Sequence, residues 1–266
     1  MKLTVVTWNI NSLRLRQEHL YRLVAQLQPD IICLQETKVP DELFPEFIGE
    51  NIGFPYVLKR GMKSYNGVAI ISRIPLELAE DTPDWCGKND CRHISATIKI
   101  AGLALNIHNF YIPAGGDIPD RSVNDKFAHK LDFLSEATAH FAKFTPERAV
   151  LAGDLNIAPL EQDVWSHKQL LNVVSHTSVE VDALNLWREQ GFYDAIRHFV
   201  PESQKLYTWW SYRNKDWAAS DRGRRLDHIW VTPDVIPSLS DYRILREARN
   251  WDCPSDHVPV ALTLDF

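Results

Sequence analysis

Ala149-Val150-Leu151-Ala152-Gly153-Asp154-Leu155-Asn156 is the segment that most strongly indicates the fold. Its first four residues form an apolar run typical of a buried strand, and polar residues follow at once. Asp154 and Asn156 are two positions apart, so an extended backbone would point both side chains the same way. A carboxylate and an amide placed like this could activate water and hold an oxygen of the reacting group. The alternative is an Asx-type turn, but Gly153 permits a close backbone approach and favours the functional interpretation.

Similar apolar runs and helical periods alternate along the rest of the chain, which predicts an α/β fold. The predicted strands are residues 3–7, 31–34, 68–71, 94–100, 103–107, 149–152, 226–231 and 258–264. Asn66-Gly67 is a turn signal before one strand, and Ala101-Gly102 predicts a hairpin. The predicted helices are residues 12–27, 124–144 and 179–190, with Pro29, Pro146 and Gly191 beyond their ends.

The composition is that of an ordinary globular protein. The chain has 266 residues, of which 45% are hydrophobic and 24% are charged. It has no Pro/Gly/Ser linker and no low-complexity stretch, so residues 1–266 are expected to form one domain. Trp8-Asn9-Ile10 and Leu155-Asn156-Ile157 both follow apolar runs, a partial echo that is either chance or a sign of two similar halves.

Cysteine usage and the lack of membrane signals predict a cytoplasmic protein with no membrane partner. The four cysteines form no CxxC pair, which favours free thiols, although Cys86 and Cys91 are close enough in sequence to be linked. No signal peptide and no apolar run of about 20 residues is present. The net charge of −6 argues against binding polyanions by bulk charge, although basic clusters at 59–63 and 222–225 could line an approach to a site.

Two polar residues after the first strands are candidate ligands of a hard cation or a phosphate. Glu36 directly follows the apolar run 31–34, and a carboxylate there is a good Mg²⁺ ligand. The alternative is a surface Glu at the start of a loop. Asn9 follows the first strand and could bind metal or phosphate oxygen, or it could cap the turn that begins the next helix.

Asp227 and His257 form a candidate acid–imidazole pair. Asp227 lies within the apolar run 226–231, where a buried carboxylate costs several kcal/mol unless it has a partner. Ser255-Asp256-His257 precedes the last strand and could supply that partner. An Asp–His pair fixes the imidazole tautomer and can keep it protonated against a phosphate. His228 is the competing histidine, and its neighbours predict a structural or surface role.

Taken together, these motifs resemble the exonuclease III family, also called AP endonuclease family 1, of the endonuclease/exonuclease/phosphatase superfamily. The resemblance extends from residue 4 to residue 260 and implies a DNase I-like fold, a four-layer α/β sandwich with two facing mixed β-sheets. The matching segments are Thr7–Arg14, Leu34–Lys38, Tyr65–Ile70, Tyr111–Pro113, Gly153–Pro159, Arg225–Ile229 and Pro254–His257.

The resemblance implies a role for each candidate residue. Glu36 would bind Mg²⁺, for which Mn²⁺ could substitute, with Asn9 and Asp256 close to the metal. Asp154 would orient or deprotonate the attacking water, and Asn156 would hold a phosphate oxygen. Asp227 would pair with His257 at the scissile phosphate, and Tyr111 would reach the phosphate or the leaving oxygen. The implied substrate contacts are Asn11, Lys38, Trp209, Arg224 and Leu226.

The function implied is that of a DNA repair enzyme. It would cleave double-stranded DNA at abasic sites and remove 3′-blocking groups or nucleotides, as a monomer with no obligatory protein partner. Trp209 and Leu226 match positions of a pocket for an extruded abasic sugar. Trp210, Tyr212 and Arg213 could contact DNA, although core packing is the alternative for the tryptophans of this segment.

Two departures from the family pattern leave the preferred substrate open. Ala114 stands where relatives often carry Asn or Gln, and Arg224 stands where some have a second pocket Trp. One alternative is therefore a 3′-phosphatase and 3′-exonuclease with weak abasic-site incision. The others are a phosphoesterase of the superfamily with a non-DNA substrate and a non-catalytic DNA-binding module.

Overall fold

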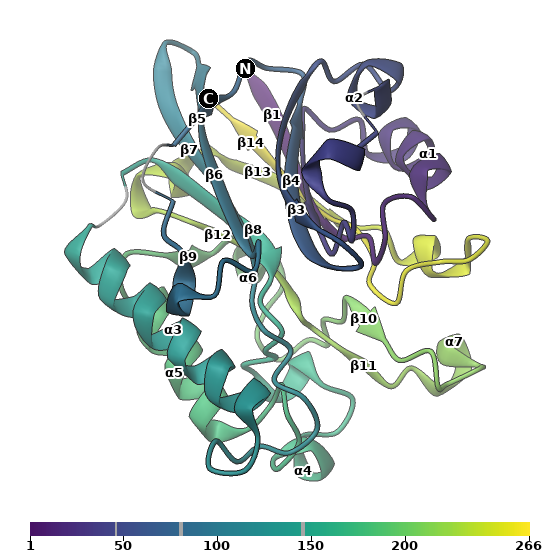
Figure 1. Cartoon of the computed structure of the whole chain (residues 1–266), viewed down its shortest axis with the longest axis vertical. Helices are drawn as coiled ribbons and strands as arrows, with labels where there is room; N and C mark the ends of the chain where they lie inside the picture. The colour runs from purple at the N-terminus through teal and green to yellow at the C-terminus, as the bar shows by residue number, and fades with distance from the viewer. Residues whose placement is uncertain (46, 80–81, 145–146) are drawn as a thin grey trace.

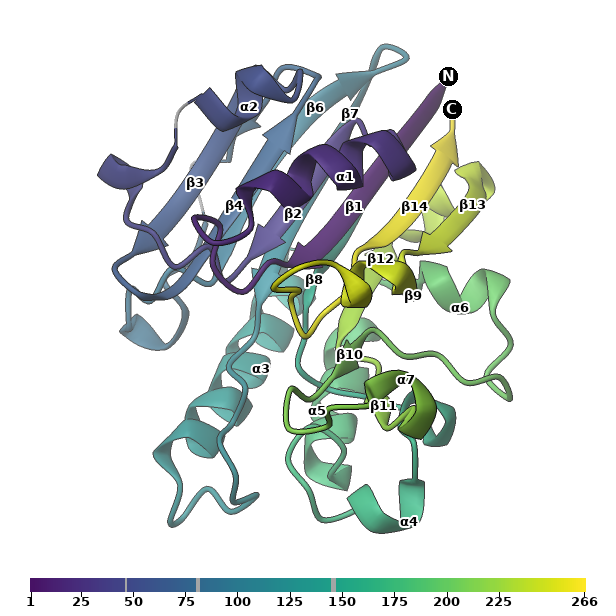
Figure 2. The same ribbon diagram turned by 90° about the vertical axis from the view of Figure 1, so that its right-hand side faces the viewer.

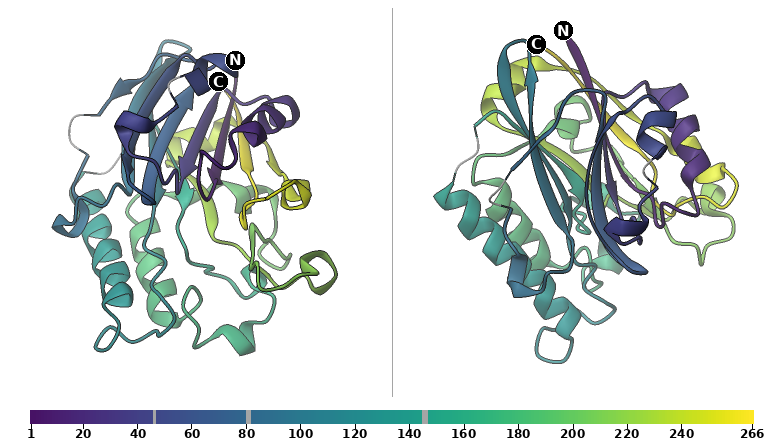
Figure 3. Two further views of the ribbon diagram at one scale, coloured as in Figure 1. Left: turned by 45° about the vertical axis from the view of Figure 1, so that its right-hand side comes forward. Right: turned by 45° about the horizontal axis from the view of Figure 1, so that its top comes forward.

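The computed structural model describes residues 1–45, 47–79, 82–144 and 147–266. Two six-stranded sheets face each other, and helices cover both outer faces, as Figures 1 and 3 show. α1 (Gln17–Leu27) and α2 (Phe47–Asn51) lie on the first sheet, and α3 (Asp125–Lys143) and α5 (Ser178–Arg188) on the second. The four-layer α/β sandwich expected from the sequence is confirmed.

Each sheet combines strands from distant parts of the chain. The first sheet, in spatial order, contains β13 (Leu239–Ile244), β14 (Val260–Asp265), β1 (Lys2–Asn9), β2 (Ile31–Gln35), β4 (Tyr65–Ser72) and β3 (Tyr56–Met62). The second contains β5 (Glu77–Leu78), β6 (His93–Ile100), β7 (Leu103–Tyr111), β8 (Ala149–Asp154), β12 (Asp227–Val231) and β9 (Tyr193–Asp194). The remaining elements are α4 (His167–Leu170), α6 (Ala195–Phe199), β10 (Trp209–Trp210), α7 (Trp217–Ser220) and β11 (Gly223–Arg224).

The two sheets follow the same plan. Each has one parallel pair at its centre, β1 with β2 and β7 with β8, and every other pairing between neighbours is antiparallel. A helix makes each parallel crossover, α1 in the first sheet and α3 in the second. The sequence echo follows β1, the first strand of one parallel pair, and β8, the second strand of the other, so its two copies do not lie on equivalent strands.

Apolar side chains fill the spaces between the four layers. Alternate residues of the central strands, such as Val5 of β1 and Val150 of β8, point between the sheets. The intervening residues face the helices: Trp8 packs with Leu20 of α1, and Leu151 packs with Phe133 of α3. This packing leaves the polar ends of the central strands at the edge of the core.

Most predicted elements are observed, with three local differences. Asn66-Gly67 lies inside β4 and not in a turn. The first helix begins at Gln17, because Asn11 and Ser12 have positive φ and belong to a turn. The strand expected from residue 226 begins at Asp227. Within the residues described, no helix is both long and apolar enough to cross a membrane.

Candidate active site

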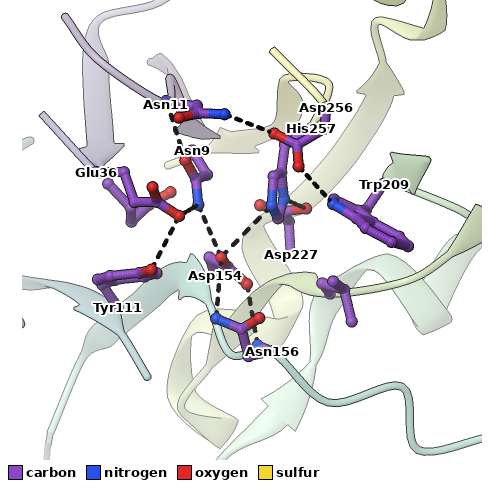
Figure 4. A network of polar contacts seen from close by, with 12 residues as sticks. Asn9, Asn11, Glu36, Tyr111, Asp154, Asn156, Trp209, Asp227, Asp256 and His257 are labelled. Atoms are coloured by element: carbon purple, nitrogen blue, oxygen red, sulfur yellow. Dashed lines mark hydrogen bonds and ion pairs between the residues drawn. The ribbon is translucent and has the colours of Figure 1, made fainter. Parts of the chain in front are cut away.

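The ends of the four central strands bring polar side chains together at one edge of the sandwich. Asn9 ends β1, Tyr111 ends β7 and Asp154 ends β8, while Glu36 directly follows β2. Figure 4 shows these side chains pointing toward one another from the two facing sheets. The strand-end residues expected to share a site therefore do so.

Asn9 is the central link of this cluster. Its Nδ2 donates to Glu36 Oε1 and to Asp154 Oδ2, both at 2.9 Å. Its Oδ1 accepts from the backbone N–H of Asn11 at 3.0 Å. Asn9 thus forms the expected turn and also lies in the acidic cluster, so the two interpretations of this residue are compatible.

Glu36 is held as a carboxylate by several donors. Tyr111 donates its hydroxyl to Oε1 at 2.9 Å, and the Lys38 ammonium lies 2.7 Å from Oε2. Burial alone would raise the pKa of Glu36, but Lys38 and the Asn9 amide outweigh burial and lower it. Burial and the nearby carboxylates raise the pKa of Tyr111 well above its usual value, so Tyr111 keeps its proton.

Asp154 and Asn156 meet through a turn and not through an extended backbone. Asn156 has a φ of 52°, and its N–H donates to Asp154 Oδ1 at 3.0 Å, which is an Asx-type turn. The expectation of an extended segment is wrong here, although Asn156 Nδ2 still reaches Asp154 Oδ2 at 3.2 Å. At Gly153, a Cβ atom would lie only 2.1 Å from the Phe110 carbonyl oxygen, so glycine is required for this approach.

A protonated histidine lies beside Asp154. His257 donates from Nδ1 to Asp227 Oδ2 at 2.9 Å, and its Nε2 lies 3.7 Å from Asp154 Oδ2. Burial opposes the charge on His257, but Asp227 and Asp154 outweigh burial and raise the pKa of His257 to about 10. For Asp154, burial exceeds the opposing effect of His257 and raises the pKa to about 7.

His228 has the structural role that was one of the two expected for it. It is fully buried, and its Nε2 lies 2.8 Å from the Ile157 carbonyl oxygen. Burial lowers the pKa of His228 to about 3, so the ring is neutral. The partner of Asp227 is therefore His257, as the sequence suggested.

A second set of polar residues surrounds the acidic cluster. Asn11 donates to Asp256 Oδ1 at 3.0 Å and accepts from the Lys38 ammonium at 2.6 Å. Trp209 Nε1 donates to Asp256 Oδ2 at 2.9 Å. The observed hydrogen bonds thus connect Asp256 to Asn11 and Trp209, while Asp256 and Glu36 line the same cavity.

A cavity of about 260 Å³ opens at the cluster. Arg224 forms part of its wall and donates to the Val174 carbonyl oxygen at 2.9 Å and to Ser175 Oγ at 2.7 Å. The Arg224 guanidinium also lies 5.4 Å from the centre of the Trp209 ring. Other residues lining the cavity are Glu36, Tyr111, Asn156, Leu226, Asp256 and His257.

Two residues expected near the substrate are instead part of the core. Trp210 is buried and packs with Tyr207 and Trp217, so a DNA contact for its ring is ruled out. Arg225 is fully buried and pairs with Asp194 at 2.7 Å, so it does not line the approach. Arg225 is therefore buried, whereas its neighbours in the basic cluster are exposed (Arg222) or half-buried (Arg224).

Sequence reasoning missed a buried ion pair beneath the site. Lys130 of α3 lies 2.6 Å from Glu180 of α5, and both side chains are fully buried. The Lys130 ammonium also donates to the carbonyl oxygens of Asn156 at 2.8 Å and Ala114 at 3.3 Å. The sequence offered one sign of this pair, namely a lysine among the apolar residues of the helix predicted at 124–144.

The donor set fits a hard divalent cation. Asp154, Asp227 and His257 have ligand atoms within 4.8 Å of one another, and His257 Nδ1 is already paired with Asp227 Oδ2 at 2.9 Å. Glu36 is the more suitable carboxylate, because the Lys38 ammonium between it and Asn11 already marks a position that attracts positive charge. Carboxylate and amide oxygens are the ligands that Mg²⁺ prefers.

A two-sheet sandwich with carboxylates, amides and a protonated histidine at one edge defines a phosphoester hydrolase of DNase I-like fold. The chain belongs to the endonuclease/exonuclease/phosphatase family, whose model matches residues 6–257. The family is one of metal-dependent nucleases, with which the acidic and histidine cluster agrees.

Individual relatives match over almost the whole chain. Exodeoxyribonuclease III of Haemophilus influenzae is 30% identical, covering 96% of this chain and 97% of its own. The DNA repair nuclease APEX1 of Danio rerio is 27% identical, covering 99% of this chain and 82% of its own. Two solved structures share a TM-score of 0.89 and cover 99% of this chain and all of their own. They are an AP endonuclease from Archaeoglobus fulgidus, 33% identical, and the 3′-5′ exonuclease NExo from Neisseria meningitidis, 31% identical.

Proposed function

We propose that this chain is a Mg²⁺-dependent phosphodiesterase of DNA repair that cleaves double-stranded DNA at abasic sites and removes 3′-blocking groups or nucleotides. The observation that carries this proposal is one polar cluster: Asn9 bonds to both Glu36 and Asp154, and the Asp227–His257 pair lies beside Asp154. Glu36 and His257 line the cavity that opens at this cluster. The relatives named for DNA exonuclease and AP endonuclease activity support it. The enzyme would act in the cytoplasm as a monomeric single domain over residues 1–266, without an obligatory protein partner.

His257 and Asp154 would divide the proton chemistry. His257, with a pKa near 10, would present its Nε2 proton to a non-bridging oxygen of the scissile phosphate. Asp154, with a pKa near 7, would accept the proton of the attacking water close to neutral pH. Asp227 would keep the imidazole protonated and in the correct orientation.

Tyr111, Asn156 and Asn9 would complete the polar surroundings of the phosphate. The Tyr111 hydroxyl keeps its proton and could donate to the phosphate or to the leaving oxygen. Asn156 is fixed by its bonds to Asp154 and to the Ile112 carbonyl oxygen at 2.9 Å, and it would hold a phosphate oxygen. Preorganised donors of this kind stabilise charge that develops in the transition state.

Glu36, with Asn9 and Asp256 close by, would hold the Mg²⁺, and Mn²⁺ could take its place. The bound ion supplies Lewis-acid stabilisation of the phosphate charge. Lys38 would then turn from Glu36 toward the DNA backbone. Substrate contacts are proposed for Asn11, Lys38, Trp209, Arg224 and Leu226.

A rate comparison on three duplexes tests the proposed function. The duplexes carry an internal abasic site, a 3′-phosphate and a matched 3′ end, each with Mg²⁺ and with EDTA. Product formation that requires Mg²⁺ and is lost in EDTA is the expected result. Absence of product from all three duplexes in Mg²⁺ would overturn the proposal and leave a non-DNA phosphoester, or DNA binding without cleavage, as the remaining candidates.

A second candidate keeps the chemistry and changes the balance of substrates. Arg224 is tied to Val174 and Ser175 and stacks on Trp209, so it places a charged group in the cavity wall. This wall favours a charged 3′-terminal phosphate over an uncharged abasic sugar. Preferential cleavage of the 3′-phosphate duplex over the abasic duplex would support the second candidate, namely a 3′-phosphatase and 3′-exonuclease with weak abasic-site incision.

A further inference from the structure

A groove of about 850 Å³ lies next to the catalytic cavity, and apart from Trp209 and Arg224 its lining residues have no role in the function proposed so far. Its volume lies in the upper part of the range for ligand sites, roughly 300–1,000 Å³. Gly116, Val174, Trp209 and Arg224 line both the groove and the catalytic cavity, so the two are continuous. Figures 1 and 2 place the surrounding elements, β10, β11, α7 and α4, together on one side of the sandwich.

Two arginine–tryptophan pairs line this groove. The Arg222 guanidinium lies 4.8 Å from the centre of the Trp165 ring, and Arg224 lies 5.4 Å from that of Trp209. A guanidinium over an indole ring can offer a stacking surface, because nucleobases stack on both kinds of group. The free N–H groups of such an arginine can at the same time reach phosphate oxygens.

The groove also carries an excess of positive charge. Arg213, Arg222 and Arg224 line it, with Asp117 as the one carboxylate among its lining residues. Carboxylates nearby are already committed, since Asp221 pairs with Arg246 at 2.8 Å. None of the ion pairs found among the described residues involves the three groove arginines, which leaves their charge available to an anion.

A continuous backbone ladder connects the groove to the catalytic histidine. The backbone N–H of Trp165 donates to Gly223 at 3.1 Å, and that of Thr208 donates to Arg224 at 2.9 Å. The N–H of Val258, directly after His257, donates to Thr208 at 2.8 Å. The two tryptophans are therefore held at fixed positions relative to the reacting phosphate.

We propose that this groove, defined by Trp165, Trp209, Arg213, Arg222 and Arg224, binds unpaired deoxynucleotides next to the scissile phosphate. Paired bases in a duplex stack on their neighbours and present no free face, so the two stacking surfaces select single-stranded DNA. The enzyme would accordingly process frayed or mismatched ends better than matched ones. This inference rests on the proposed function, because the groove adds to the same active site.

Cleavage and binding of two duplexes that differ only at the 3′ end test the groove. One duplex has four unpaired 3′-terminal nucleotides, and the other is fully matched. Affinity is measured by fluorescence anisotropy in EDTA, and cleavage is measured in Mg²⁺. The variants are W165A, R222A and the conservative W165F. The matched control is R22A, because Arg22 stacks on Trp251 at 5.8 Å outside the groove.

We expect W165A and R222A to weaken binding and cleavage of the unpaired end roughly ten-fold, the scale of one lost stacking contact. Both variants should process the matched duplex within about two-fold of wild type, W165F should keep most of the activity, and R22A should change neither substrate. Equal losses on both duplexes, or no loss at all, would overturn the groove assignment. Arg222 is exposed, so R222A keeps the test valid if W165A fails to fold. Failure of wild type to cleave either duplex would instead refute the proposed function.

Discussion

Asp154 and His257 are two buried groups whose pKa values lie far from their usual values, that of Asp154 because of burial and that of His257 because of the nearby carboxylates. Each lies within reach of the other, and Asp227 acts on both. The pKa of the carboxyl group rises to about 7 and that of the imidazole to about 10. At neutral pH, one group can therefore accept a proton while the other carries one.

Replacing Asp154 with Asn should lower the single-turnover cleavage rate by roughly 10²–10⁴-fold, the scale of a lost general base. The amide is nearly isosteric, so DNA binding in EDTA should stay within a few-fold of wild type. Rates on the abasic duplex and anisotropy titrations measure the two quantities. Asp132→Asn, at an exposed position on α3, is the control. Near-normal turnover of Asp154→Asn would remove Asp154 from the proposed mechanism.

Replacing Asp227 with Asn should lower the pKa of His257, because the main group that raises it is lost. The proton on His257 would then be lost at lower pH, so the alkaline limb of the rate profile should move down by roughly one to three pH units. Cleavage rates between pH 6 and pH 10 measure the shift, and the exposed Asp241→Asn serves as the control. An unchanged alkaline limb would show that His257 does not act as a proton-carrying group.

The site role of a residue could be predicted from the sequence where that residue directly follows an apolar run that forms a strand. Glu36 and Asp154 are such cases, because each follows an apolar run that forms a strand. The left-handed φ of Asn156 could not be foreseen, since an Asn two positions after an Asp also fits an extended segment. Burial of Arg225 depends on Asp194, a partner 31 residues away that no local pattern reveals.

At the scale of elements, the Lys130–Glu180 pair connects α3 to the loops that carry the site. Glu180 accepts from the backbone N–H of Ser175 and from Thr177 Oγ1, while Lys130 donates to the carbonyl oxygen of Asn156. α5 thus begins at a capping box that is itself tied to the buried lysine. This connection therefore helps to fix the loops around the catalytic cavity, together with the bonds of Arg224 to Val174 and Ser175.

Lys130→Met should lower the free energy of unfolding by about 3–5 kcal/mol, because Glu180 is left buried without its counter-charge. Urea denaturation followed by circular dichroism measures the change. Arg121→Met removes the exposed pair with Asp132 and should change stability by less than about 1 kcal/mol. A loss for Lys130→Met as small as that of the control would show that the pair is not needed to hold α3 and α5 together.

The sequence revealed the strands of the buried centre and missed those of the edges. β1, β2 and β8 are almost entirely buried and apolar, so their composition identified them. β3 and β13 are edge strands without a fully buried residue, and three of the six residues of β13 are Ser240, Asp241 and Arg243. β10 and β11 have only two residues each, and their pairing depends on contacts with the 256–258 segment.

At the scale of the whole molecule, several buried histidines link stability to pH. Burial lowers the pKa of His108 to about 4 and that of His228 to about 3, and it also lowers that of His93. These groups are neutral in the folded state and titrate near pH 6.5 when unfolded. Their contribution is therefore fully present above pH 6.5 and is lost as pH falls toward their folded values.

The melting temperature should accordingly fall between pH 6.5 and pH 4. Each of these histidines lowers stability by up to about 1.4 kcal/mol per pH unit in that range. Thermal melts of wild type and His228→Gln at half-unit steps of pH measure the effect, and the variant should show a shallower slope. Identical slopes would mean that His228 does not bind a proton on unfolding.

The first sheet has a consequence for synthesis of the protein on the ribosome. Its central strand β1 pairs on one side with β14, so that Lys2 lies opposite Asp265. Ser255 closes onto Asn9 by donating to its carbonyl oxygen at 2.7 Å, and His257 follows two residues later. A nascent chain therefore lacks both β14, a neighbour of β1, and the histidine of the candidate active site until residues 257–265 have left the exit tunnel. We expect chains that stop short of residue 257 to have no phosphoesterase activity, because they lack the imidazole proposed to contact the phosphate.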